Sequence, residues 1–133
     1  MNVPEAPFVL HLPNVMHLAT DVAGVLSDSS SSLALAAALH PSAAVCGTPT
    51  WKARDVIADL EKMDRGRYAG PVGWMDASGD GEWGIALRCG QVQDDPAIIR
   101  LFAGCGIVAG SDPQDEVAES NAKLRPMLSA LGD

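Results

Sequence analysis

The sequence has few basic residues. Nine lysines and arginines stand against seventeen aspartates and glutamates in 133 residues, which gives a net charge of −8. Nucleic-acid binding requires a basic surface that neutralises phosphates, so the composition argues against that function. A small anionic ligand is not excluded, because a few converging cations can form a positive pocket in an acidic protein.

Cysteines and long apolar runs are also scarce. Cys46, Cys89 and Cys105 are too few and too far apart for a disulfide framework or a CxxC metal site. The longest apolar run is short and interrupted, so no membrane span is predicted, and the first residues do not resemble a secretory signal. With 47% apolar and 20% charged residues, we expect one folded domain located in the cytoplasm.

Prolines, glycines and capping residues divide the chain into predicted elements. Three prolines within residues 1–14 predict an irregular lead-in with one short edge strand. The main domain is expected over residues 15–133, and it begins with strand-like residues as far as Leu26. Apolar spacing predicts one helix over 33–39, after a serine cap, and another from Thr50, as its cap, to Met63.

Three further strands and a last helix are expected downstream. The apolar stretches Tyr68–Met75 and Trp83–Val92 flank a turn rich in Gly and Asp and predict an antiparallel hairpin, and Ile98–Val108 predicts a third strand. Ser111, with Gln114 three residues later, predicts a capping box for a helix that runs to the last glycine. This order indicates an α+β domain with an antiparallel sheet and helices packed on it.

The last predicted helix carries Glu116, Glu119 and Lys123 on one face, at positions i, i+3 and i+7. Two carboxylates at this spacing can bind Mg²⁺, which usually takes one or two protein oxygens and completes its shell with water and substrate. The alternative is a structural role, in which acids near the helix N-terminus complement its dipole and Glu119 pairs with Lys123.

A second candidate is Arg88, which stands between apolar residues on a predicted central strand. A buried arginine is costly unless it meets an anion, and its planar fork suits a carboxylate. Tyr68 begins the segment YAGPVGW on the partner strand. The alternative is that Arg88 faces solvent and pairs with one of the many acids.

Gly104 and His40 are further candidates. Gly104 lies in FAGCGI, where small residues could let backbone N–H groups approach an anion, although a β-bulge explains the pattern as well. His40 precedes Pro41 and could act as a base or hydrogen-bond donor. The alternative for His40 is that it caps a helix C-terminus.

Three long segments of the chain carry a family signature. They are LHPSAAVCGTP (39–49), LEKMDRGRYAGPVGWMDASGDGEWGIALRC (60–89) and LFAGCGIVAGSDPQDEVAESNAK (101–123). In this order they resemble the chorismate-binding enzyme family, and most closely its isochorismate synthases of menaquinone and siderophore pathways. Cys105 stands where the family more often has Ala, and Ser120 stands where Thr is usual.

The resemblance implies roles for the candidate residues. Glu119 resembles a carboxylate that binds catalytic Mg²⁺, with Glu116 in the same acidic cluster. Arg88 and Lys123 resemble cations that hold the carboxylates of the substrate. The other matched substrate-pocket positions are Tyr68, Gly104, Ala44, Val45 and His40.

The implied reaction converts chorismate to isochorismate: water adds at C2 and the C4 hydroxyl leaves. In the family, the lysine base, the glutamate acid and a further Mg²⁺-binding glutamate lie in a larger region before the part that is resembled here. We therefore expect a C-terminal fragment or half of a split enzyme, inactive alone, with a complementary N-terminal chain or self-association. Two alternatives stay open, namely another chorismate-using enzyme of the salicylate or anthranilate synthase type, and a non-catalytic remnant or partner-binding module.

Overall fold

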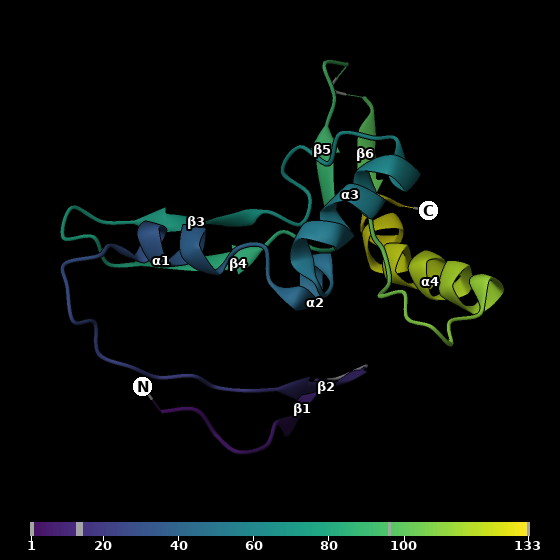
Figure 1. The fold of residues 1–133 in the computed structure, drawn as a ribbon. Helices are drawn as coiled ribbons and strands as arrows, with labels where there is room; N and C mark the ends of the chain where they lie inside the picture. The colour runs from purple at the N-terminus through teal and green to yellow at the C-terminus, as the bar shows by residue number, and fades with distance from the viewer. Residues whose placement is uncertain (1, 13–14, 96, 133) are drawn as a thin grey trace. The chain divides into compact units, whose positions relative to one another are not determined.

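The structure, a computed structural model, describes residues 2–12, 15–95 and 97–132. It confirms the predicted α+β class, with helices and short antiparallel strand pairs (Figure 1). The chain divides into two compact units between Ser30 and Ser31.

The first unit is built on one strand pair. Strand β1 (Phe8–Leu12) runs antiparallel to β2 (Val15–Ala19), with Phe8 opposite Ala19. Beyond the pair, Asn2 and Ala23 exchange two backbone hydrogen bonds of 2.6 and 3.1 Å. The expected edge strand is therefore present, and its partner lies beyond the predicted boundary after residue 14.

The second unit opens with three helices. Helix α1 (Ser32–Leu39) has the predicted serine cap, because the Ser31 hydroxyl accepts a hydrogen bond from the Ala34 amide at 3.2 Å. A short helix, α2 (Ala43–Cys46), lies in the Pro-containing segment between α1 and the next helix. In α3 (Thr50–Glu61), Thr50 is the first helical residue and not the cap, which is Pro49. The helix ends at Lys62 in the left-handed conformation, slightly before the predicted end.

Helix α1 packs against the predicted hairpin. Strand β3 (Pro71–Met75) pairs with β4 (Gly81–Ile85), and the Asp76 carboxylate closes the turn by accepting from the Ser78 and Asp80 amides. Two contacts fix α1 on this hairpin: the Ser32 amide donates to the Gly79 carbonyl at 2.8 Å, and the Trp83 indole donates to the Ser32 hydroxyl at 3.2 Å.

The segment predicted as one strand over 83–92 is two strands that pair with different partners. Strand β5 (Cys89–Val92) pairs with β6 (Ile99–Phe102), so the described residues form three two-stranded sheets and not one sheet. The break falls at Arg88, whose φ of 49° is a left-handed conformation that no strand can continue through. Strand β6 ends at Phe102, earlier than predicted.

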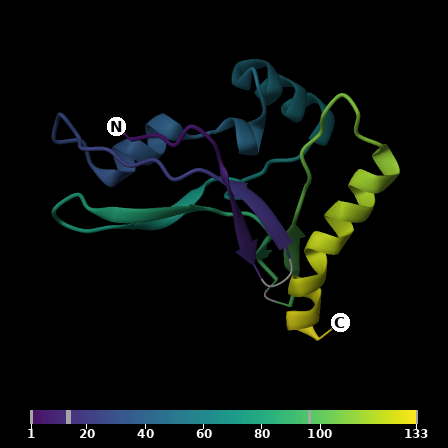
Figure 2. The ribbon, with the colours of Figure 1, turned by 90° about the horizontal axis from the view of Figure 1, so that it is seen from below.

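The last helix, α4 (Pro113–Leu131), contacts β6 (Figure 2). Its N-cap is Asp112, whose carboxylate accepts from the Gln114 and Asp115 amides at 2.8 and 3.2 Å. The predicted capping box is therefore wrong by one residue, and the Ser111 hydroxyl accepts instead from the Val108 amide. The helix ends as predicted at Gly132, where φ is 94° and a side chain would be strained.

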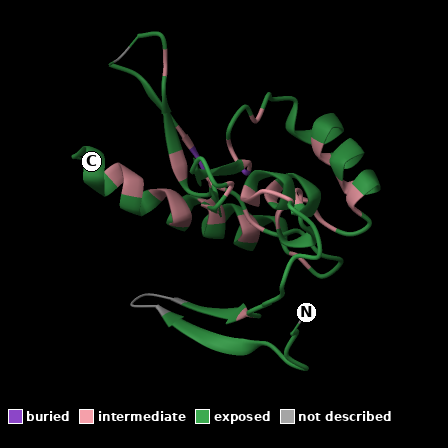
Figure 3. Cartoon of the chain, turned by 90° about the vertical axis from the view of Figure 1, so that its left-hand side faces the viewer, coloured by how far each residue is buried: buried purple, intermediate pink, exposed green. Residues whose placement is uncertain are grey.

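Most of the chain is exposed. Among the described residues only Ala69 and Phe102 are buried, at 5% and 7% exposure (Figure 3). On α4 the apolar residues Val117 and Leu131 are 61% and 52% exposed. The two buried residues lie at the start of the hairpin and the end of β6, so the small core supports the region around Tyr68.

Candidate active site

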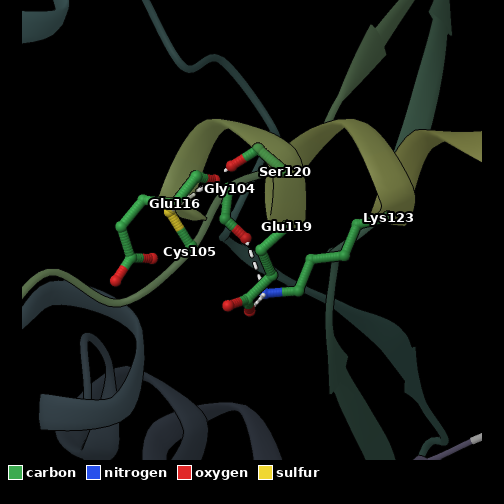
Figure 4. Close-up of polar contacts among 6 residues, drawn as sticks. All are labelled: Gly104, Cys105, Glu116, Glu119, Ser120 and Lys123. Atoms are coloured by element: carbon green, nitrogen blue, oxygen red, sulfur yellow. Dashed lines mark hydrogen bonds and ion pairs between the residues drawn. The ribbon is translucent and has the colours of Figure 1, made fainter. Parts of the chain in front are cut away.

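Helix α4 and the loop after β6 meet through Lys123. The Lys123 ammonium donates to the Gly104 carbonyl at 2.9 Å and pairs with Glu119 Oε1 at 2.6 Å (Figure 4). The predicted i, i+4 pair is therefore formed, and Lys123 also bridges to a residue nineteen positions away. The Lys123 side chain is 24% exposed and that of Glu119 is 54% exposed, so both groups remain accessible to a ligand.

Tyr68 lies against Gly104. A Cβ atom at Gly104 would come within 2.9 Å of the Tyr68 hydroxyl, so glycine leaves the space that the phenol occupies. The Tyr68 ring stacks on Phe102, with 5.2 Å between centroids and 18° between planes. Burial raises the pKa of Tyr68 above its ordinary value, and Arg65 and Lys123 oppose this shift. Tyr68, Gly104, Glu119 and Lys123 thus form one cluster.

Glu116 lies one turn before Ser120 on α4. Hydrogen bonds from the Ser111 hydroxyl and then the Cys105 thiol are the main causes that hold its pKa below the ordinary value. The Cys105 thiol also lies 3.5 Å from the Glu116 main-chain oxygen, and the Ser120 hydroxyl donates to the Cys105 sulfur at 3.4 Å. A groove of about 360 Å³ adjoins these residues. Glu116 is therefore held as a carboxylate beside the cluster.

The donor set of α4 fits Mg²⁺. Glu116 and Glu119 extend from the same side of the helix (Figure 4), and carboxylate oxygens are the ligands that this ion prefers. The described residues include no group of three or more His, Cys, Asp or Glu side chains that could hold a metal. Two carboxylates are nevertheless sufficient, because Mg²⁺ usually keeps several waters and takes one or two protein carboxylates.

Arg88 lies at the same end of the β5–β6 pair as Gly104. It immediately precedes Cys89, whose register partner is Phe102. It is exposed, and with the described part of the chain its guanidinium forms no hydrogen bond or ion pair. The predicted position on a central strand is therefore wrong, because the residue lies in the bend between β4 and β5.

His40, Ala44 and Val45 lie in a different part of the second unit. His40 is the residue that follows α1, where its amide caps the helix by donating to the Ala36 carbonyl. It also lines an apolar groove of about 400 Å³ between α1 and the β3–β4 hairpin. Ala44 and Val45 are on α2 and do not line this groove. No hydrogen bond or ion pair between described residues links these three to Lys123.

Sequence reasoning missed two groups that support the cluster. Arg65 pairs with Glu61 and lies over the Tyr68 ring, with 5.5 Å from the guanidinium carbon to the centroid. Arg65 lies beyond the end of α3, so helical spacing does not point to its pair with Glu61. The Cys105–Ser120 contact joins a loop to a helix, and no local pattern in the sequence points to it.

Comparison with known proteins identifies the family. The family described as chorismate binding enzyme matches residues 1–132. The chain is 49% identical to isochorismate synthase DhbC of Bacillus subtilis and 41% identical to isochorismate synthase EntC of Escherichia coli K12, over 99% of this chain and 33% of each relative. It is also similar to the crystal structure described as a 2,3-dihydroxybenzoate-specific isochorismate synthase, DhbC, from Bacillus anthracis, with a TM-score of 0.89 and 50% identity over 98% of this chain and 35% of that one.

The chain belongs to the chorismate-binding enzyme family. It spans about a third of the length of the curated relatives that it matches. The predicted resemblance is thus confirmed, and the three signature segments include the residues of the cluster around Lys123. Among the described residues, no helix combines the length and the apolar character needed to cross a bilayer.

Proposed function

We propose that this chain supplies the substrate-carboxylate and Mg²⁺-binding part of an isochorismate synthase. The observation that carries the proposal is the Lys123 bridge between Gly104 and Glu119, in a chain 41–49% identical to isochorismate synthases. Chorismate is a dianion, so a binding site must bring cations together in an otherwise acidic protein. A cytoplasmic location fits this proposal and stays a prediction.

Two cations are suited to the two carboxylates of the substrate. Lys123 offers a point charge fixed on the Gly104 carbonyl, and Arg88 offers a planar fork with no partner in the described part of the chain. Both lie near the end of the β5–β6 pair, on the side from which the chain leads to Gly104. Orienting both ends of the ring compound is the contribution of these residues to the rate.

Glu119 and Glu116 would hold Mg²⁺. When bound, the ion neutralises substrate negative charge and orients the carboxylate that it contacts. The salt bridge between Glu119 and Lys123 supports this proposal, because the carboxylate that would bind the metal lies beside the ammonium that would bind the substrate. Tyr68 fills the space beside Gly104 and would form a wall of the pocket. His40, Ala44 and Val45 would line a further part of it, as the family resemblance implies.

The acid and base of the reaction belong, by the resemblance, to the part of the family fold that this chain does not match. We therefore propose that the chain acts together with the remaining two thirds of that fold. The exposed apolar side chains of the second unit would form the surface that contacts this remaining part. They include Val72, Trp74, Ile85, Val117 and Leu131, each more than 40% exposed.

A chimera tests the proposal. In it, this chain replaces the matching third of Bacillus subtilis DhbC, to which it is 49% identical. With chorismate and Mg²⁺ we expect isochorismate as the product, and we expect none from the 133-residue chain alone. A salicylate or anthranilate product would indicate another branch of the family. A folded chimera without any turnover, or steady turnover by the chain alone, would contradict the proposal.

A further inference from the structure

Arg65 makes contacts that the proposed reaction does not assign. Its Nε and Nη2 atoms donate to the two carboxylate oxygens of Glu61 at 2.8 and 2.5 Å. Such a bidentate pair fixes the plane of the guanidinium. The Arg65 side chain is 26% exposed and that of Glu61 is 32% exposed, so the pair lies at the edge of the small core.

The fixed guanidinium lies on an aromatic stack. Its central carbon is 5.5 Å from the centroid of the Tyr68 ring, which itself stacks on Phe102. The Arg100 guanidinium lies 5.6 Å from the centroid of Phe102. A guanidinium is attracted to the face of an aromatic ring, and stacked rings hold one another in place. Two arginines and two rings therefore restrict how the Tyr68 ring can rotate or slide.

The hydroxyl end of the ring reaches the candidate active site. It occupies the space at Gly104 whose carbonyl binds Lys123. We infer that Arg65, anchored by Glu61, is a positioning residue that holds the Tyr68 phenol at the substrate site. The inference rests on the proposed function for its effect on the reaction, whereas the contact itself can be measured without any substrate.

The chain has one tyrosine, so the ultraviolet absorption of tyrosinate reports Tyr68 alone. The charged groups that act on it are Arg65 and Lys123, which lower its pKa, and Glu61 and Cys89, which raise it. Arg65→Met should therefore raise the titration midpoint. The matched control is Arg67→Met, an equal change of charge at an exposed residue two positions away, and it should leave the midpoint unchanged.

Kinetics of the chimera test the positioning role. Arg65→Met should raise the KM for chorismate about three- to tenfold, with a smaller change in kcat, and Arg65→Lys should recover part of the loss. Arg67→Met should match the unaltered chimera. Equal KM values for Arg65→Met and Arg67→Met would overturn the inference, as would identical tyrosinate titrations.

The two proposals fail in different ways. If the unaltered chimera does not convert chorismate, the proposed function is wrong, while the titration still decides whether Arg65 contacts Tyr68 in solution. Circular dichroism at each pH shows that the variants are folded. If Arg65→Met does not fold, Arg65→Gln decides: a raised midpoint supports the contact with Tyr68, and an unchanged midpoint overturns it.

Discussion

Gly104 shows how one missing side chain shapes the candidate site. The Tyr68 hydroxyl fills the space that a Cβ atom would enter, and the Tyr68 ring cannot move freely because it is stacked on Phe102. The same residue offers its carbonyl to Lys123. Gly104 therefore both leaves room for the Tyr68 phenol and accepts the hydrogen bond from Lys123.

Replacing Gly104 with alanine should displace the phenol. We expect Gly104→Ala to lower the free energy of unfolding by about 1–3 kcal/mol, as for other overpacked sites, and to raise the KM for chorismate in the chimera. Denaturant unfolding and steady-state kinetics measure the two effects. Gly106→Ala is the control, because nothing lies within 4 Å of its Cβ position. Equal effects at both glycines would contradict the close packing of Tyr68.

Lys123 should contribute mainly to substrate binding. A hydrogen bond to a charged group contributes about 1.5–3 kcal/mol, so Lys123→Met should raise the KM of the chimera roughly 10- to 100-fold. Lys52→Met, on the exposed face of α3, is the matched control and should have little effect. A KM unchanged by Lys123→Met would remove this residue from the proposed substrate site.

At the residue scale, the sequence predicted partners within one helix better than partners across the fold. The Glu119–Lys123 pair follows from helical spacing alone and is present. The Lys123–Gly104 contact needs α4 to be docked beside the loop after β6, and no local pattern contains that information. The sequence prediction put Arg88 on a strand because its neighbours are apolar. In the structure Arg88 has a left-handed conformation in a bend, and the apolar neighbours alone do not distinguish a bend from a strand.

The N-terminus of α4 illustrates the same limit for a whole element. Asp112 and Ser111 are both good caps, and the capping-box pattern favoured Ser111. In the structure Asp112 receives the two amide hydrogen bonds, and Ser111 binds Val108 and Glu116. The periodicity and Gly132 predicted that this helix exists and where it ends. The choice between two adjacent caps depends instead on the conformation of the preceding loop, which the sequence pattern does not contain.

Substitution of the two residues separates these roles. Asp112→Ala should lower the free energy of unfolding by about 1 kcal/mol, a typical loss for an N-cap. Ser111→Ala should instead raise the pKa of Glu116 towards its ordinary value, because it removes the largest cause of the lowered pKa. Denaturant unfolding and the carbon-13 chemical shift of the Glu116 carboxyl check the two. If only Ser111→Ala lowered the free energy of unfolding by about 1 kcal/mol, Ser111 would be the N-cap, as the sequence predicted.

Glu116 should also make stability depend on pH. Because its pKa is lower in the folded chain than the ordinary 4.5, the carboxylate stabilises the fold above that pH, and this contribution is lost as the pH falls through the folded value. The difference in unfolding free energy between the unaltered chain and Glu116→Gln should therefore shrink on acidification. A difference independent of pH would contradict the shift.

At the scale of the molecule, the notable feature is how little is buried. Two apolar stretches on either side of a Gly- and Asp-rich turn correctly predicted the β3–β4 hairpin, whereas in place of the predicted single sheet the described residues form three separate strand pairs. The two strands of a hairpin are neighbours in the sequence, so a local pattern is enough to predict their pairing. The described residues contain no strand that joins the three pairs into one sheet. We therefore expect the exposed strand edges and apolar faces to bind another chain or a second copy of this one.

Trp74 gives a direct test of which face is to be covered. It lies opposite Glu82 on the hairpin, on the other side from Trp83 and its α1 contact, and it is 58% exposed. Trp74→Asp should leave the fold of the isolated chain intact but reduce both its self-association in sedimentation and the activity of the chimera. Trp51→Asp, on α3 at 70% exposure, provides the same substitution away from the hairpin. Because both tryptophans are exposed, general hydrophobicity would make the two variants behave alike, whereas a specific interface over the hairpin requires that only Trp74→Asp lose activity.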